Sequence, residues 1–341
     1  MTARIAPSLV DVHHSKLCYS QDRYCGHPRQ LPFRNFGNGE LVVAHFHASA
    51  TYQSRDDIGH GFGHYMGRSS VLLQRSYDSG ETWLPENEVV VWDHSRPLAE
   101  RQGVLHRADA PPVDREAFDL TSPDTLVYFG RHAVSPTGAR EPTLECFAFR
   151  SSDRGYNWEI VPTRVSPPPG FSFASIDSAP LTVLSDGTAV MPAWLDNRNT
   201  GGDSDYVGAI IGLYGSDDNG LSWMYLAEVA NDPTLRGRPG YANLVLLPSG
   251  RLQCYCNQIG GIRHALAMNY SDDGGYSWSE PQPLVTWGQS SWVSLTRDHA
   301  WSGAVRRGVL YRSPWPLRLR DGRIVVVFGR RHPPFGMGVI V

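Results

Sequence analysis

Ser271-Asp272-Asp273-Gly274-Gly275-Tyr276-Ser277-Trp278 is the stretch of this sequence that decides its fold. It follows the pattern S-x-D-x-G-x-(S/T)-W, and two further full copies run from Ser76 to Trp83 and from Ser216 to Trp223. A fourth copy, from Ser151 to Trp158, departs only in having Asn157 at the hydroxyl position. The central aspartates of the four copies are separated by 75, 65 and 55 positions, which predicts a repeat architecture.

Each copy has the chemistry of a tight turn between two strands. The aspartate carboxylate can accept hydrogen bonds from backbone N–H groups of its own turn, and the glycine permits a positive φ. The tryptophan that follows is expected to bury its large ring against the body of the fold. We refer to each octapeptide below as a box.

The box resembles the Asp box of the sialidase (neuraminidase) superfamily, whose members are six-bladed β-propellers. The resemblance covers residues 76 to 278, which is most of the chain. It implies an all-β fold, a sialidase-like six-bladed β-propeller, as a single domain over residues 1–341. In that family the boxes lie on the face away from the active site, so they indicate the scaffold and not the chemistry.

Composition agrees with a fold of many short strands and restricts the partners. The 341 residues carry a formal net charge of −3, which indicates neither a nucleic-acid nor a membrane partner. An odd, scattered set of cysteines indicates reduced thiols and a cytoplasmic protein; these are Cys18, Cys25, Cys146, Cys254 and Cys256. The sequence as written shows no apolar signal segment, and secretion would require a leader outside it. No cofactor is expected.

Alternating and apolar runs between turn residues predict the strands. A first strand is expected over residues 9–20, where it would complete the last blade and close the ring. The further expected strands are 41–47, 70–75, 125–132, 145–150, 179–184, 188–195, 206–214, 241–247, 251–257, 264–270, 309–319, 323–328 and 336–341.

These strands make four blades and three strands of a fifth, with no fifth box after Val341. We interpret this as a truncated ring whose last blade is incomplete or missing. Its open edge would self-associate unless a partner chain fills it, because unpaired strand edges invite pairing. The alternative is a five-bladed ring in which residues 336–341 pair directly with residues 9–20.

The resemblance implies a site with three arginines that clamp a substrate carboxylate, an aspartate acid/base, and a tyrosine nucleophile assisted by a glutamate. The first clamp arginine is expected ten residues before the glycine of the first strand turn. Arg29 stands ten before Gly39, and Arg34 is the nearby alternative. In the fifth blade, Arg312 is a further candidate, and Arg331 begins an Arg-His-Pro-Pro-Phe-Gly segment similar to segments of sialidase-like proteins.

The acid aspartate of that family lies in the loop after the first strand. Here that loop contains Asp56, Asp57, His60 and His64 among several glycines. Long polar loops of this kind are often functional. The two histidines have the spacing of helical metal ligands, but the glycines argue against a helix, and no metal is expected.

Blade four departs from the family pattern. The position of the glutamate is occupied by Tyr241, and that of the second clamp arginine by Asn257, with Arg238 nearby as a substitute cation. Two further polar residues, His132 and Asp177, fall at strand ends where side chains can point to a central pocket. Each has the alternative role of a hydrogen-bonded strand-end residue.

Three functions remain open on this sequence. The first is a sialidase-like exo-glycosidase that hydrolyses a terminal, acidic sugar from a glycan, with Asp57, Asp56, Tyr241 and His60 as catalytic candidates. The second is a propeller polysaccharide lyase or hydrolase that uses a His/Tyr pair, drawn from His60, His64, His132 and Tyr241. The third is a propeller that binds glycans without turning them over.

Overall fold

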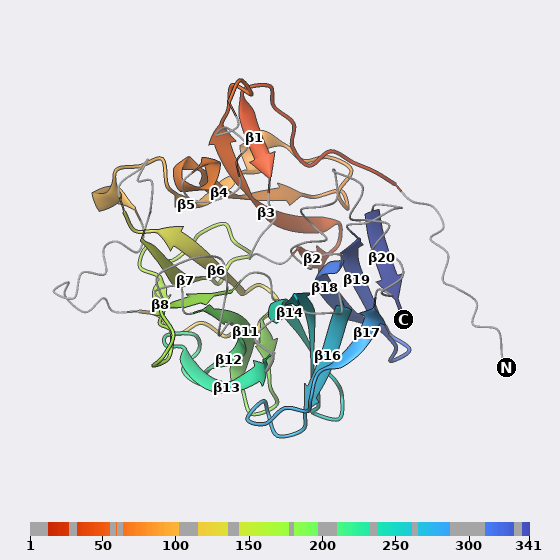
Figure 1. Ribbon diagram of the computed structural model, residues 1–341. Coiled ribbons are helices and arrows are strands. Elements are labelled where there is room, and N and C mark those ends of the chain that lie inside the picture. Colours follow the sequence, from red (N-terminus) through yellow and green to blue (C-terminus); the bar gives the residue numbers. More distant parts are fainter. Residues whose placement is uncertain are drawn as a thin grey trace.

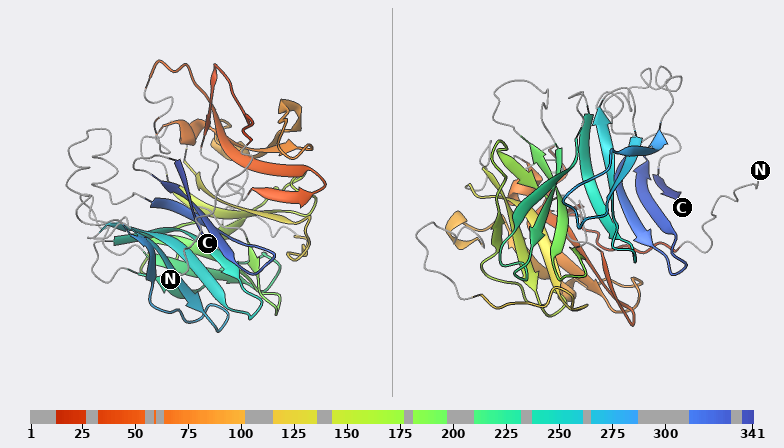
Figure 2. Two further views of the ribbon diagram at one scale, coloured as in Figure 1. Left: turned by 90° about the vertical axis from the view of Figure 1, so that its right-hand side faces the viewer. Right: turned by 90° about the horizontal axis from the view of Figure 1, so that it is seen from below.

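The computed structural model describes residues 13–26, 33–54, 59, 64–101, 115–135, 143–176, 181–196, 210–231, 237–260, 265–286, 311–330 and 336–341. These residues form five antiparallel sheets. Figure 1 shows the sheets in chain order around a common centre, with β14 and β18 toward the middle, and Figure 2 shows them as neighbouring blades. The chain is therefore an all-β propeller. The described part contains five sheets, so the expected sixth blade is not confirmed.

Blade 1 consists of β1 (Arg23–Gly26), β2 (Arg34–Gly37), β3 (Glu40–Ser49), β4 (Ser70–Ser76) and β5 (Val89–Asp93). Blade 2 consists of β6 (Leu126–Ala133), β7 (Leu144–Ser151) and β8 (Thr163–Val165). Blade 3 consists of β9 (Phe173–Ser175), β10 (Thr182–Val183), β11 (Ala189–Asp196), β12 (Ile210–Ser216) and β13 (Met224–Ala230).

Blade 4 consists of β14 (Gly237–Leu246), β15 (Leu252–Gly260), β16 (Ala265–Ser271) and β17 (Gln282–Thr286). Blade 5 consists of β18 (Tyr311–Arg318), β19 (Ile324–Arg330) and β20 (Gly336–Ile340). Three short 3₁₀ helices complete the described elements: η2 (Tyr65–Arg68), η3 (Pro85–Asn87) and η4 (Leu98–Glu100). No helix in the described part is long and apolar enough to span a membrane.

The four boxes connect the last two strands of blades 1 to 4, and their geometry confirms the expected turn. In the first box, the Asp78 carboxylate accepts the backbone N–H of Thr82 at 2.9 Å and its hydroxyl at 2.6 Å. These bonds hold the pKa of Asp78 down at about 2. Gly80 takes a φ of 91°, which a side chain would disfavour. In the variant box, the Asn157 amide donates to Asp153 at 2.6 Å and so replaces the hydroxyl.

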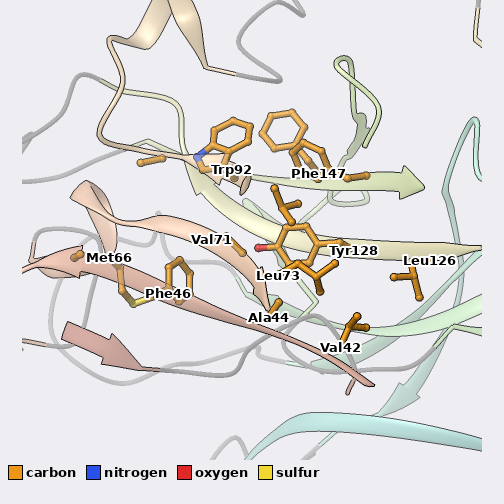
Figure 3. Packing of buried hydrophobic residues seen from close by; sticks show 14 of the residues in the cluster. Val42, Ala44, Phe46, Met66, Val71, Leu73, Trp92, Leu126, Tyr128 and Phe147 are labelled. Carbon is orange, nitrogen blue, oxygen red and sulfur yellow. The ribbon is translucent and has the colours of Figure 1, made fainter. Parts of the chain in front are cut away.

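Apolar cores lie between neighbouring blades. Figure 3 shows the core between blades 1 and 2, where Val71 and Leu73 of β4 face Tyr128 and Phe147 of blade 2. Equivalent clusters join blade 2 to blade 3 and blade 3 to blade 4. Because cores lie on both sides of blade 2, β6 is buried along its whole length.

Residues 13–20 are not a strand, which corrects the expectation for the described part of residues 9–20. They run from the side of blade 5 toward β1 (Figure 1) and contact the first box instead of a strand edge. The Ser15 hydroxyl donates to the Gly80 carbonyl, and His13 lies 3.0 Å from the Glu81 carboxylate. Thr163 of blade 2 donates in the same way to the Gly220 carbonyl of the third box. For the first box, residues 13–20 therefore make the contact that blade 2 makes for the third box.

The described pairing of β20 is with β19 alone, so the alternative closure of residues 336–341 on residues 13–20 is absent from the described residues. Within the part of the ring that the structure covers, β20 is an edge strand, and Met337 on it is 71% exposed.

A buried ion-pair network links blades 1 and 2, and it generates a prediction. Glu40 accepts from both Arg75 and Arg154, and the Arg75 side chain is only 1% exposed. Glu40→Gln removes the charge that compensates a buried guanidinium, so the free energy of unfolding should fall by about 3–5 kcal/mol. Urea denaturation measures this change.

The matched control is Asp321→Asn, because the Asp321–Arg323 pair is mostly exposed, at 51% and 64%. This substitution should leave the free energy of unfolding nearly unchanged. Equal effects of the two substitutions would show that the buried network does not hold the blades together.

Candidate functional site

The first strands of blades 4 and 5 share a backbone irregularity. β14 carries a bulge between Gly240 and Asn243, and β18 carries one between Arg312 and Trp315. Tyr241 and Ser313, inside these bulges, have positive φ values of 51° and 52°. Strained non-glycine residues of this kind cluster at functional sites, because the surrounding structure must hold them in place.

The two bulges meet through a tyrosine and an arginine. β18 packs against β14, and the Arg312 guanidinium carbon lies 4.1 Å from the centre of the Tyr241 ring. Both side chains are half-buried. A guanidinium over an aromatic face is an attractive pair that stiffens both side chains. Two of the sequence-predicted site residues, 71 positions apart, are therefore brought together.

Two buried asparagines hold the β18 bulge. The Asn243 amide donates to the Pro314 carbonyl at 2.7 Å, and the Asn257 oxygen accepts the Ser313 N–H at 3.3 Å. Both asparagines have no exposed surface. Asn257, a predicted substrate-binding residue, thus supports the backbone beside Arg312 instead of presenting its side chain to solvent.

One polar atom of each asparagine has no partner within the described residues: Asn243 Oδ1 and Asn257 Nδ2. Buried polar atoms are nearly always hydrogen-bonded in folded proteins. Both atoms are buried, so neither offers a hydrogen bond at the surface of this junction.

The first strands of blades 1 and 3 are interrupted at the corresponding place. β1 and β2 pair with two halves of the same edge of β3, and β9 and β10 do so along β11. In the sequence, Arg29 lies between β1 and β2, and Asp177 lies between β9 and β10. Both residues are outside the described part of the chain. The placement of both residues therefore stays a prediction.

Other predicted site residues also lie outside the described residues, and their placement stays a prediction. These are Asp56, Asp57, His60 and Arg331. Arg238 is described as part of β14, where it pairs with Ile259, but its side chain is outside the description.

Arg34 and His64 lie at opposite ends of blade 1. Arg34 is near the box end, where its guanidinium donates to the Pro123 carbonyl at 3.2 Å. His64 is exposed and precedes η2 in the connection between β3 and β4, which leaves the sheet at the other end. Of the two, only His64 lies at the end of the blade opposite the boxes.

His132 is packed into the core between blades 1 and 2. Its ring stacks on Trp92 with centroids 4.2 Å apart, and it has no exposed surface. Neither ring nitrogen has a hydrogen-bond partner among the described residues. Burial, with the nearby His94 and Arg131, holds the pKa of His132 well below its usual value. In this structure the residue therefore packs the core and does not face an open site, nor is it the hydrogen-bonded strand-end residue of the alternative reading.

Three polar residues at strand ends were missed by sequence reasoning. Arg131 is buried with its guanidinium carbon 5.2 Å from the Phe173 ring centre, and Asp196 is a buried carboxylate at the end of β11. Arg330 ends β19, opposite Tyr311. Each of these residues lies near the end of a strand that runs away from the box end of its blade. That position is the signal that could have identified it.

A family model for the BNR repeat-like domain matches residues 86–298. This match covers more than half of the chain. The chain belongs to the BNR repeat-like domain family. Sialidases with the propeller fold are among the similar solved structures, which agrees with the resemblance of the boxes.

Three solved structures show the extent of this similarity. A Dyadobacter fermentans protein of unknown function has a TM-score of 0.59 and 19% identity, over 93% of this chain and 81% of its own. A Hadza microbial sialidase has a TM-score of 0.54 and 15% identity, over 91% and 53%. The NanB sialidase of Streptococcus pneumoniae has a TM-score of 0.53 and 11% identity, over 92% and 58%.

The chain thus spans a little more than half the length of either sialidase. At these identities the similarity establishes the fold of this BNR repeat-like chain. A search of curated proteins found no match.

The buried histidines generate a prediction for stability against pH. Burial lowers the pKa of His132, and it lowers that of His94 to about 3, so both stay neutral in the native state. The unfolded chain binds these protons near pH 6.5, so the free energy of unfolding must fall as the pH drops below that value. Each histidine should contribute a slope of about 1.4 kcal/mol per pH unit.

His132→Phe keeps a flat ring against Trp92 and removes one titrating group. Urea denaturation from pH 6.5 to 4.5 should show a slope smaller by about 1.4 kcal/mol per pH unit than in the unsubstituted protein. The control His14→Phe changes an exposed ring and should leave the slope as it is. An unchanged slope in His132→Phe would contradict the neutral, buried state of His132.

Proposed function

We propose that this BNR repeat-like propeller is a sialidase-like exo-glycosidase that hydrolyses a terminal, acidic sugar from a glycan. The observation that carries the proposal is the Arg312–Tyr241 pair, built on strained bulges of neighbouring first strands. It combines a cation for an acidic sugar with a phenol for catalysis. Membership of the family and the sialidases among the similar structures support the same class of substrate.

Arginine suits the recognition role because its planar guanidinium matches a carboxylate with two parallel hydrogen bonds. Arg312 and Arg330 lie at one end of the β18–β19 pair, where Arg312 is opposite Gly329. In the proposed site, Arg312 contributes positive charge beside the carboxylate of the sugar. In the sequence, Arg331 follows Arg330 directly and Arg29 lies between β1 and β2, so both are proposed as further cations.

Tyr241 takes the nucleophile role in this proposal. Its phenolic oxygen would bond to the anomeric carbon as the glycosidic bond breaks, while Asp57 or Asp56 protonates the departing oxygen. Water then attacks the same carbon, releases Tyr241 and yields the free sugar. His60 and His64 are the groups proposed to accept the proton of the phenol. This route uses a tyrosine where most glycosidases use a second carboxylate.

One observation favours a second candidate, a propeller that binds glycans without turning them over. Asn257 stands where the resemblance implies a clamp arginine, and its amide is fully buried in support of the β18 bulge. That position therefore supplies no cation. A site with fewer cations still binds polar sugars through hydrogen bonds, but it orients a carboxylate less strictly. Lyase chemistry with a His/Tyr pair is distinguished by its unsaturated product.

Turnover by the purified chain tests the proposal. A panel of fluorogenic sialosides, uronides and neutral glycosides should contain at least one acidic substrate that is hydrolysed, and Tyr241→Phe should lower kcat by about 100-fold or more. The control Tyr276→Phe alters an exposed tyrosine within the fourth box and should retain activity. Binding without turnover would favour the second candidate, and absorbance from an unsaturated product would favour a lyase.

The charge of Arg312 has its own test. Arg312→Gln should raise KM for the acidic substrate more than it changes kcat, with a loss in kcat/KM of about 10- to 100-fold. Arg318→Gln, at the exposed opposite end of β18, is the matched control and should leave kcat/KM unchanged. An equal loss on acidic and neutral sugars would show that Arg312 does not recognise the carboxylate.

A further inference from the structure

Cys18 and Cys25 lie side by side at the outer end of blade 1. Both line a cavity of about 410 Å³, together with Tyr19, Arg23 and Tyr52. The two thiols are near enough for Cys25 to influence the pKa of Cys18. Their exposure is intermediate, whereas the other three cysteines, Cys146, Cys254 and Cys256, are buried. The cavity gives a small solute access to this one pair of neighbouring thiols.

The local backbone explains why two cysteines seven positions apart meet. Cys25 is fixed in β1, opposite His47 of β3. Before β1 the chain turns back: the Asp22 carbonyl accepts the Ala50 N–H at 2.9 Å, and the Arg23 carbonyl accepts the Tyr52 hydroxyl at 2.9 Å. Cys18 lies before the bend at residues 21–22 and lines the same cavity as Cys25.

The two thiols are chemically unequal. Burial raises the pKa of Cys18 to about 12, and the hydrogen bond and charge of Cys25 and then the charge of Glu88 act in the same direction. Cys18 consequently keeps its proton. Because the thiolate is the reactive form of a cysteine, Cys18 is not expected to attack first.

We propose that Cys18 and Cys25 form a reversible dithiol–disulfide pair, a modification site for peroxides. The Cys25 thiolate attacks one peroxide oxygen, the O–O bond breaks, and a sulfenic acid and one water result. The Cys18 sulfur then displaces hydroxide from the sulfenic sulfur, and its proton completes a second water. Two thiols thus lose two electrons and two protons, and the peroxide is reduced to two waters.

The bond would connect two parts of the chain that are otherwise held by weak contacts. Cys25 belongs to the sheet of blade 1, and Cys18 belongs to the segment that reaches the first box through the Ser15 hydroxyl and a His13–Glu81 pair that is mostly exposed. Exposed ion pairs hold a segment only weakly. Oxidation would therefore fasten this segment to β1, and reduction by a thiol would release it.

The sequence allows a direct test, because Arg23 separates the two cysteines. The folded chain is treated with hydrogen peroxide, remaining thiols are alkylated in denaturant, and trypsin then cuts after Lys16, Arg23 and Arg29. The expected product is peptide 17–23 joined to peptide 24–29, which separates on reduction. A peptide 17–29 left uncut at Arg23 and lighter by two hydrogen atoms has the same meaning.

Cys18→Ser and Cys25→Ser must each abolish the joined product, whereas Cys146→Ser, in the core of blade 2, must retain it. Equilibration with mixtures of reduced and oxidised glutathione should convert one form into the other reversibly. The proposal is overturned if both peptides remain alkylated after oxidation, or if Cys25 is recovered as a sulfinic acid beside an alkylated Cys18. No glycan is used, so this outcome is independent of the proposed glycosidase activity.

Discussion

A buried arginine near the end of the strand that leads into a box binds the box of the next blade, and the arrangement of the scaffold depends on this contact. Arg75 donates to the Arg154 carbonyl at 2.7 Å, and Arg150 donates to the Asn219 carbonyl at 2.7 Å. Each arginine is neutralised by a glutamate, Glu40 or Glu159. Buried charges are tolerated only when paired and fully hydrogen-bonded, so the contact fixes the positions of the second and third boxes where blades meet. At the junction of blades 3 and 4, the box of blade 4 packs against an apolar side chain of blade 3 instead. Leu213 is so close to Gly275 that a Cβ on this glycine would lie 2.3 Å from Leu213 Cδ2.

The scaffold could be predicted because each of blades 1 to 4 contains the same box in its sequence. Every box requires a carboxylate, a glycine in the left-handed region, and no side chain on that glycine where it faces the preceding blade. These requirements are visible in the sequence as one octapeptide. The strands before the boxes follow from their apolar runs. The strand after a box carries a weaker signal, since β17 is largely exposed and has a proline. The strand expected over residues 9–20 was wrong for residues 13–20. Side-chain contacts to the first box hold this segment, and such contacts leave no periodic pattern in the sequence by which they could be predicted.

The sequence could propose candidate site residues but not their contacts. Spacing from turn glycines selected Tyr241 as a candidate, yet the approach of Arg312 to Tyr241 depends on two bulges that no periodicity predicts. The placement of His132 shows a second limit. In a strand with both faces buried, alternation no longer separates a core position from a site position, so a histidine at its end fits either role.

The two ends of each blade meet different requirements. At the box end, one backbone solution recurs with nearly the same side chains, since any change would alter the contact with the preceding blade. At the other end, the bulges of β14 and β18 share a positive φ but carry Tyr241 and Ser313, which are chemically unlike. Asn243 and Asn257 hydrogen-bond to the backbone of the β18 bulge, so its conformation does not depend on the side chain of Ser313. Asn257 stands where the resemblance implies a clamp arginine, and in this structure its amide holds the strand that carries Arg312. The side chain at this position therefore acts on the neighbouring blade through the backbone of its bulge.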